Sequence, residues 1–187
     1  VGKLLAHGKD TLEAQAFING TGAGQPVGLL YDLTTNHSAT CKVDAGGSAS
    51  FLDDDVYKLD SDLPARYRAS SSFLANRAVY NAIRAFGSNA GSDMWERIGA
   101  DMPPQLLGRP AYEAEAMSGS LATNATPLIF GDFENYVIAD RIGMTVELVQ
   151  HLFGSNRRPT GQRGWYAYYR VGADVVNPGG FRYLEIS

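Results

Sequence analysis

The chain has 187 residues, of which 44% are hydrophobic and 19% are charged. This is the balance of a soluble globular protein with one large domain or two small ones, not of a disordered chain. The single cysteine, Cys41, excludes an internal disulfide framework and fits a reducing compartment. Apolar runs are too short to span a bilayer, and no signal peptide opens the chain. Because the first residue is Val1 and not Met, we expect a fragment or a processed product.

Charge is distributed unevenly along the chain. The formal net charge of −4 argues against a generic nucleic-acid binder held by phosphate contacts. Residues 1–140 carry 10 basic and 17 acidic side chains, a net of −7, whereas residues 141–187 carry 6 and 3, a net of +3. Acidic and basic regions on one surface allow copies of a protein to dock head-to-tail. An arginine-rich genome bias is the competing explanation for the basic region, and the sequence leaves both open.

Helical signals come first in the chain. Residues 3–18 have apolar positions at helical spacing, and Asn19 and Gly20 supply the stop. The glycine-rich residues 20–26 predict a loop, and residues 31–50 a loop or short strands. The remaining expected elements of this half are a helix over 51–59, a strand over 69–75, and a helix that is capped by Asn76 and ends at Gly87.

Strand signals dominate the second half. One strand is expected to follow residues 106–110 and to end at Glu115, and further strands are expected over 128–130, 136–139, 144–152 and 181–186. The clearest pattern is the alternation over 163–176, which predicts an unusually long strand. One face carries Trp165, Ala167, Tyr169, Val171, Ala173 and Val175; the other carries Tyr166, Tyr168, Arg170 and Asp174. Its aromatic and arginine content is typical of single-strand nucleic-acid stacking or of a buried sheet surface, and we favour burial. The fold class is therefore α+β.

No organised catalytic, metal or phosphate signature is present in the sequence. The glycines of residues 20–24 follow a helix and lack the spacing of a dinucleotide or nucleotide loop. Asp53, Asp55 and Asp60 lack the glycine and glutamate of a calcium loop, and the three histidines are scattered. No nucleophile elbow occurs. We therefore expect no enzymatic activity, no cofactor and no metal.

Several stretches together resemble the major capsid protein family of tailed bacteriophages, which has the Hong Kong 97-like fold, and look like the versions in phages of actinobacteria. The stretches run in family order over nearly the whole chain. They are 13–29 (EAQAFINGTGAGQPVGL), 63–68 (LPARYR), 73–77 (FLANR), 106–112 (LLGRPAY), 115–117 (EAM), 129–133 (IFGDF), Tyr136, 140–141 (DR), 157–165 (RRPTGQRGW) and 170–174 (RVGAD).

The resemblance implies two domains. A peripheral domain with a long spine helix and long antiparallel strands would comprise residues 1–24 and 141–175. A mixed α/β axial domain would comprise residues 25–140 and 176–187. The family's N-terminal arm and extended E-loop have no counterpart here. The isopeptide crosslink of some members is not expected, because residues 160–163 (TGQR) hold no asparagine before the last long strand.

The resemblance implies a structural function, a shell subunit that self-assembles into an icosahedral capsid enclosing phage DNA. Expected partners are copies of the chain in pentamers and hexamers and packaged DNA bound without sequence specificity. Scaffold, protease, portal or decoration proteins are further expected partners, and a membrane is not. The expected location is the virion, assembled in the host cytoplasm. The alternatives are an encapsulin-type nanocompartment shell and, in another class, a hydrolase with an unrecognised site.

Two charged segments are the candidate inter-subunit contact. Arg157, Arg158 and Arg163 lie in a polar loop before the long strand, and like charges so close together gain nothing in an isolated chain. The acidic partner on a neighbouring copy is expected in the segment 53–62, with Asp53, Asp54 and Asp55 as the candidate contact residues, and other acidic groups are open as alternatives. A solvated loop tip is the competing interpretation of the arginines.

Overall fold

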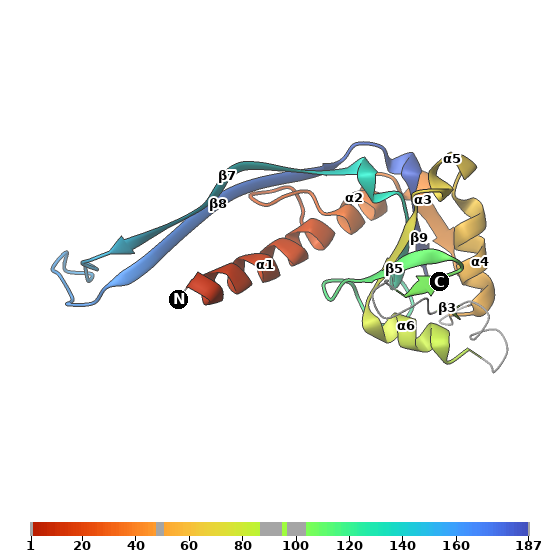
Figure 1. The fold of residues 1–187 in the computed structure, drawn as a ribbon, viewed down its shortest axis with the longest axis horizontal. Coiled ribbons are helices and arrows are strands. Elements are labelled where there is room, and N and C mark those ends of the chain that lie inside the picture. The colour runs from red at the N-terminus through yellow and green to blue at the C-terminus, as the bar shows by residue number, and fades with distance from the viewer. Residues whose placement is uncertain (1, 48–50, 87–94, 97–103, 187) are drawn as a thin grey trace.

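A long two-stranded hairpin and one helix extend from an α/β unit that holds the rest of the chain (Figure 1). The computed structural model describes residues 2–47, 51–86, 95–96 and 104–186, and for 95–96 the backbone alone. The predicted end of a helix at Gly87 lies outside the described residues.

The first helix, α1 (Gly2–Asn19), agrees with the expected one within a residue at each end. The amide of Gly20 closes the last turn on the carbonyl of Ala16 at 2.9 Å. A Cβ at Gly20 would lie 2.3 Å from the carbonyl oxygen of Pro26, so only glycine fits this stop. The expected apolar stripe is not buried in the single chain, because Ile18 is the one buried residue of α1 and Leu12 is 65% exposed.

The hairpin consists of β7 (Tyr136–Val149) and β8 (Gly164–Val175), paired antiparallel from Tyr136↔Val175 to Val149↔Gly164. The two short strands expected over 136–139 and 144–152 are wrong as separate elements. They form one strand, whose pairing with β8 shifts register between Asp140 and Thr145. These irregularities interrupt the apolar alternation between the two expected strands.

The two predicted faces of β8 are confirmed. The odd-numbered residues from Ala167 to Val175 are half-buried, and the even-numbered residues from Tyr166 to Asp174 are exposed. The half-buried face is turned toward α1, where the Lys9 ammonium lies 5.3 Å from the ring centroid of Tyr169. The expected burial of this sheet surface is thus partial in a single chain, since Trp165 is 53% exposed.

A seven-stranded mixed sheet forms the centre of the α/β unit in the described part of the chain, in the order β1-β9-β6-β2-β5-β4-β3. The pairs β1–β9 and β2–β5 are parallel and the others antiparallel. The strands are β1 (Lys42–Asp44), β2 (Ser72–Ala75), β3 (Trp95–Glu96), β4 (Gln105–Leu106), β5 (Arg109–Glu113), β6 (Leu128–Gly131) and β9 (Phe181–Glu185).

Helices cover both faces of this sheet. On one face, α4 (Asp53–Asp62) and α6 (Arg77–Arg84) pack over a core that includes Phe73 and Phe130, whose rings stack at 4.3 Å. On the other, α2 (Leu29–Thr35), α3 (Ser38–Cys41) and the end of α1 pack over Ile129 and Tyr183. The side-chain alternation of β6 and β9 supplies both cores, with Leu128 and Leu184 on one face and Ile129 and Tyr183 on the other.

Short helices correct the expected secondary structure. Residues 31–50, expected as a loop or short strands, do hold the short strand β1, but they also hold most of α2 and all of α3. The short helix α2 is stabilised by packing, because Leu29 and Leu33, four residues apart, are both buried. Helix α5 (Ala65–Arg68) and the 3₁₀ turn η1 (Phe133–Asn135) were not expected. The 3₁₀ turn η2 (Pro178–Gly180) lies within residues 177–180, whose Asn-Pro-Gly-Gly sequence predicts a turn.

The hairpin joins the α/β unit at Tyr136. Its hydroxyl donates to the carbonyl of Val27 at 2.7 Å and lies 3.2 Å from the carbonyl of Phe17. The amide of Val27 in turn donates to the carbonyl of Ala173 at 3.1 Å. These bonds connect the end of α1, the following turn and both hairpin strands at one point.

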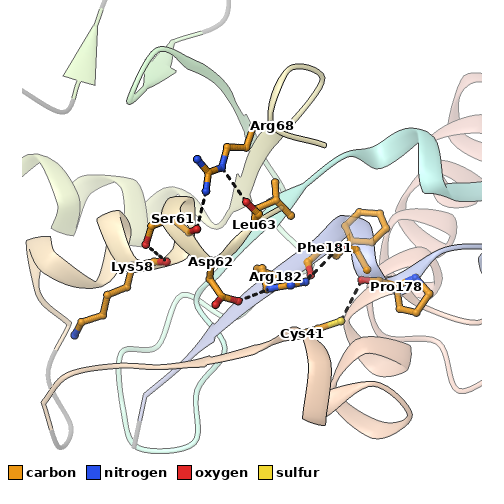
Figure 2. A network of polar contacts seen from close by, with 10 residues as sticks. Cys41, Lys58, Ser61, Asp62, Leu63, Arg68, Pro178, Phe181 and Arg182 are labelled. Atoms are coloured by element: carbon orange, nitrogen blue, oxygen red, sulfur yellow. Dashed lines mark hydrogen bonds and ion pairs between the residues drawn. The ribbon is translucent and has the colours of Figure 1, made fainter. Parts of the chain in front are cut away.

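The chain leaving β8 is held in the same region. In η2, the carbonyl of Pro178 accepts the Cys41 thiol at 3.1 Å. Figure 2 shows the neighbouring ion pair, in which Arg182 of β9 donates to Asp62 at the end of α4 at 2.5 Å. Arg182 also donates to the carbonyl of Phe181 at 2.7 Å, so its largely buried guanidinium links helix, strand and turn.

Candidate inter-subunit surfaces

The two charged segments expected to make a contact lie at opposite ends of the molecule. Figure 1 shows the loop between β7 and β8 at the far tip of the hairpin and α4 on the remote side of the α/β unit. The arginines and the acidic segment therefore do not meet within one chain. Any pairing between them requires a second copy.

The loop at the hairpin tip is an ordered structure with its own hydrogen bonds. The amide of Leu152 donates to the carbonyl of Gln162 at 3.1 Å, and that of Thr160 donates to the carbonyl of Leu152 at 2.9 Å. Phe153 forms an isolated antiparallel bridge with Pro159. This backbone fixes the directions in which the loop presents its side chains.

Arg157, Arg158 and Arg163 are all exposed. Within the described residues none of the three forms an ion pair. Arg157 has a φ of 55°, which a non-glycine residue adopts at an energetic cost. The loop thus holds three guanidinium groups in solvent, one of them on a strained backbone.

Asp55 differs from its two acidic neighbours. It is completely buried, and its carboxylate accepts the amides of Gly46 at 2.8 Å and Leu52 at 3.0 Å. The Lys58 ammonium donates to it at 3.1 Å. Asp55 stabilises the start of α4 from the third helical position, as the acidic member of a capping box does. Its carboxylate is therefore not presented to a neighbouring copy.

The acidic surface consists of the other aspartates of α4. Asp54 is exposed and Asp53 and Asp60 are half-buried, and none of them forms an ion pair within the described chain. Asp62 is already paired with Arg182. Of the three expected acidic contact residues, Asp53 and Asp54 have carboxylates that reach solvent.

The hairpin also exposes an unusual amount of apolar surface. Both faces contribute, and the tip contributes most, with Phe153 66% and Trp165 53% exposed. The exposed large side chains are Val137, Ile138, Ile142, Val146, Leu148, Leu152, Phe153, Trp165, Tyr166 and Tyr168. Monomeric proteins rarely expose contiguous apolar surface on this scale, and an interaction surface is the usual reason.

The residue types that carry chemistry do not cluster in the described structure beyond the pair of His37 and Asp32, whose Nε2 and Oδ2 atoms lie 3.6 Å apart. His7 lies on α1, His37 precedes α3 and His151 lies beyond β7. In the described ranges, no three His, Cys, Asp or Glu side chains converge as a metal site would require. Burial raises the pKa of the Cys41 thiol, which keeps it protonated and unreactive. No described helix is both long and apolar enough to cross a bilayer.

Two features of these surfaces were missed from the sequence. The internal role of Asp55 has a sequence signal, because Asp55 lies three residues after Leu52, which precedes the helix, as the acidic member of a capping box does. The same acidic residue also fits a helix start that faces solvent, so the signal does not distinguish the two. The exposure of the hairpin has no sequence signal, because its alternating residues resemble those of a buried sheet.

Comparison with known proteins identifies the family. The family model of the phage capsid family matches residues 2–186. Among solved structures, the capsid of an empty GTA particle has 30% sequence identity and a TM-score of 0.82, covering 100% of this chain and 65% of that one. The capsid of a native GTA particle has 29% identity and a TM-score of 0.78, with coverage of 100% and 64%. A search of curated proteins finds no match.

A more distant structure shares the fold alone. The holo-SrpI encapsulin complex from Synechococcus elongatus PCC 7942 has 14% identity and a TM-score of 0.59, covering 97% of this chain and 62% of that one. The present chain spans just under two thirds of the GTA capsid chains. These likenesses confirm the expected Hong Kong 97-like α+β fold. Since the family model covers nearly every residue, the chain belongs to the phage capsid family.

Proposed function

We propose that this chain forms the shell-building part of a major capsid protein, copies of which assemble into a closed icosahedral head around DNA. The observation that supports this most directly is the family match over residues 2–186. The exposed apolar hairpin supports it independently, because exposed apolar surface of this kind usually marks a surface that other subunits cover. The function is structural, and no catalytic turnover is part of the proposal.

The two-part organisation fits such a shell. Residues 1–24 and 141–175 form the proposed peripheral domain, whose helix and hairpin extend outward, and residues 25–140 and 176–187 form the proposed axial domain. The boundary at 141 falls within β7, so that strand connects both domains without a linker. Pentamers and hexamers, packaged DNA, other head proteins, assembly in the host cytoplasm and a place in the virion belong to the same proposal.

We propose that the hairpin tip of one copy contacts the acidic surface of α4 on another. Arg157, Arg158 and Arg163 lack acidic partners within the described chain, and Asp53 and Asp54 lack basic ones. A desolvated Arg–carboxylate pair contributes about 1.5–3 kcal/mol through its charge-assisted hydrogen bonds. Several such pairs, repeated over a shell, favour assembly strongly.

The test is shell formation by charge-swapped subunits. Replacing the three arginines with serine should leave the melting temperature nearly unchanged and strongly reduce the yield of closed shells in electron microscopy. The change to three aspartates should abolish assembly, and combining it with Asp53→Arg and Asp54→Arg should restore it. Unchanged yield and salt tolerance in the serine variant would show that the loop is merely solvated.

An encapsulin-type compartment is the second candidate within the same fold. The 30% identity to a GTA capsid against 14% to an encapsulin favours the phage-type shell. Nuclease-protected DNA inside purified particles would support a genome shell. Particles that contain protein cargo and no DNA would support the compartment.

A further inference from the structure

One face of the hairpin is left uncovered by the described chain. Figure 1 shows α1 along one side of the hairpin and no helix along the other. The even-numbered residues of β8 lie on this uncovered side, and the register of the hairpin places residues of β7 beside them. We call this surface the free face; its residues are Val137, Ala139 and Ile142 of β7 and Tyr166, Tyr168, Arg170, Gly172 and Asp174 of β8.

Along β8, the free face is complementary to itself about Gly172. Arg170 and Asp174 lie two residues before and two residues after Gly172, and both are exposed. At about 3.3 Å per residue they are about 13 Å apart, too far to pair with each other. Neither forms an ion pair in the described ranges, and the Asp174 carboxylate accepts the amide of the next residue at 2.9 Å. Two residues further out on each side, Tyr168 and Val176 are 39% and 70% exposed, so apolar groups flank the two charges.

The β7 part of the free face has the same symmetry. Ala139 lies beside Gly172 in the hairpin register. Val137 and Ile142 lie on either side of that pair, and their apolar side chains are 48% and 39% exposed. A Cβ at Gly172 would meet nothing within 4 Å, so the centre of the face is open and carries only the methyl group of Ala139. The flanking side chains can therefore reach a partner that lies flat on this face.

A half-turn of a second hairpin about the centre of the free face matches these groups. The axis lies between the two sheets and runs across the strands, so that β8 faces β8 and β7 faces β7, each antiparallel to its counterpart. A residue two places before Gly172 then faces the residue two places after Gly172 in the other copy. The facing pairs are Arg170 with Asp174, Ile142 with Val137, and Tyr168 with Val176. Such an interface is isologous, so each contact occurs twice.

We propose that two copies of this chain stack the free faces of their hairpins about a two-fold axis over Gly172 and Ala139. The two Arg170–Asp174 pairs fix the register, and the apolar pairs around them are removed from water. The partner is a second copy because the surface matches itself in both charge and apolar character. The contact involves none of the arginines at the hairpin tip. Its place between the subunits of a shell rests on the proposed function, whereas the pairing of two copies does not.

Thiol crosslinking in solution tests the axis. Gly172→Cys places one thiol of each copy at the axis, where a short bismaleimide should join them, and the new side chain meets no atom within 4 Å. The matched control is Tyr166→Cys on the same face. Residue 166 lies six residues from the axis, so its two thiols would be about 40 Å apart at about 3.3 Å per residue, beyond the reach of the reagent. The control should give no more dimer than the chain without an added cysteine, since Cys41 is completely buried.

Charge swapping tests the register in the Gly172→Cys background. Arg170→Asp places two aspartates opposite each other and Asp174→Arg places two arginines opposite each other, so each should lower the yield of crosslinked dimer about tenfold. Combining the two substitutions restores opposite charges and should restore the yield. A combined variant no better than the single ones, or equal crosslinking of Gly172→Cys and Tyr166→Cys, would overturn the proposal. So would no crosslinking of Gly172→Cys, which would leave the free face solvated or open to an unlike partner.

Assembled particles test whether a shell uses this contact. Gly172→Cys should crosslink pairs of subunits in intact particles, and crosslinking in solution alone would overturn the assignment to the shell. If no shell forms, the proposed capsid function fails, and crosslinking in solution still decides whether two hairpins stack.

Discussion

Replacement of Asp55 is expected to destabilise the α/β unit far more than replacement of its neighbour Asp54. The buried Asp55 carboxylate accepts the amides of Gly46 and Leu52 and the ammonium of Lys58. In Asp55→Ala both amides lose their acceptor. A buried donor left unpaired costs about 1–3 kcal/mol, and the lower half of that range applies because Gly46 and Leu52 are themselves exposed enough to admit water.

The expected loss is therefore about 2–4 kcal/mol in the free energy of unfolding, with little added by the half-exposed Lys58. For a chain of this size it corresponds to a fall in Tm of about 5–15 °C. Urea and thermal unfolding, followed by circular dichroism, measure both. Asp55→Asn keeps one acceptor oxygen and should lose about half as much.

Asp54→Ala is the matched control, because Asp54 is exposed, carries the same charge and lies in the same helical turn. It should change the free energy of unfolding by less than about 1 kcal/mol, the size of a helix-dipole interaction. Equal effects of Asp55→Ala and Asp54→Ala would refute the internal role of Asp55 and return it to the acidic surface.

Three further expectations concern α1, the hairpin joint and the thiol. Gly8→Ala should stabilise the chain by about 0.5–1 kcal/mol, because a Cβ at Gly8 meets nothing within 4 Å. Gly20→Ala should destabilise the chain, because its Cβ would lie 2.3 Å from the carbonyl oxygen of Pro26. Chemical denaturation compares the two variants, and equal changes in the free energy of unfolding would contradict the role of Gly20 as a helix stop. Tyr136→Phe removes the hydroxyl that bonds to the backbone where the hairpin joins the α/β unit, and it should lower the free energy of unfolding by about 1 kcal/mol. It should also speed amide exchange in the turn that follows α1. An unaltered exchange pattern would show that this hydroxyl does not hold the turn to the hairpin. Because burial raises the pKa of Cys41, the unfolded thiol ionises first, so stability should fall as pH rises from about 8.5 to about 10, between the ordinary thiol and tyrosine values, and this fall should be absent in Cys41→Ala. Above about pH 10 the raised pKa values of Tyr80, Tyr136 and Tyr183 lower stability in both proteins, so identical profiles below that pH would contradict the prediction.

Local patterns predicted the elements whose signals lie within a few residues. The alternation over 163–176 gave the right faces of β8, because a strand places successive side chains on opposite sides whatever else the chain does. Asn76 was correctly placed as a helix cap, and its side chain accepts the amide of Ala78 at 3.0 Å. The glycine stop after α1 follows from the same kind of local constraint.

Elements that depend on distant partners were not predictable in this way. Helices α2 and α3 have only seven and four residues, too few to be stable alone, and they are helical because Leu33 and Cys41 fill a core made with β6 and β9. The strand β9 pairs with β1, which lies more than a hundred residues earlier, and with β6, which lies about fifty residues earlier. No residue near β9 in the sequence specifies either neighbour.

The same division applies to the candidate contact surfaces. The sequence by itself determined the family, the long strand and the charge of the hairpin tip, since these depend on residue identity and order. Only the tertiary structure decided that Asp55 is used internally, that the two charged segments lie at opposite ends, and that the hairpin exposes large apolar side chains. The reason is physical, because burial and unpaired backbone groups are defined by what packs alongside a residue, and those neighbours come from remote parts of the chain.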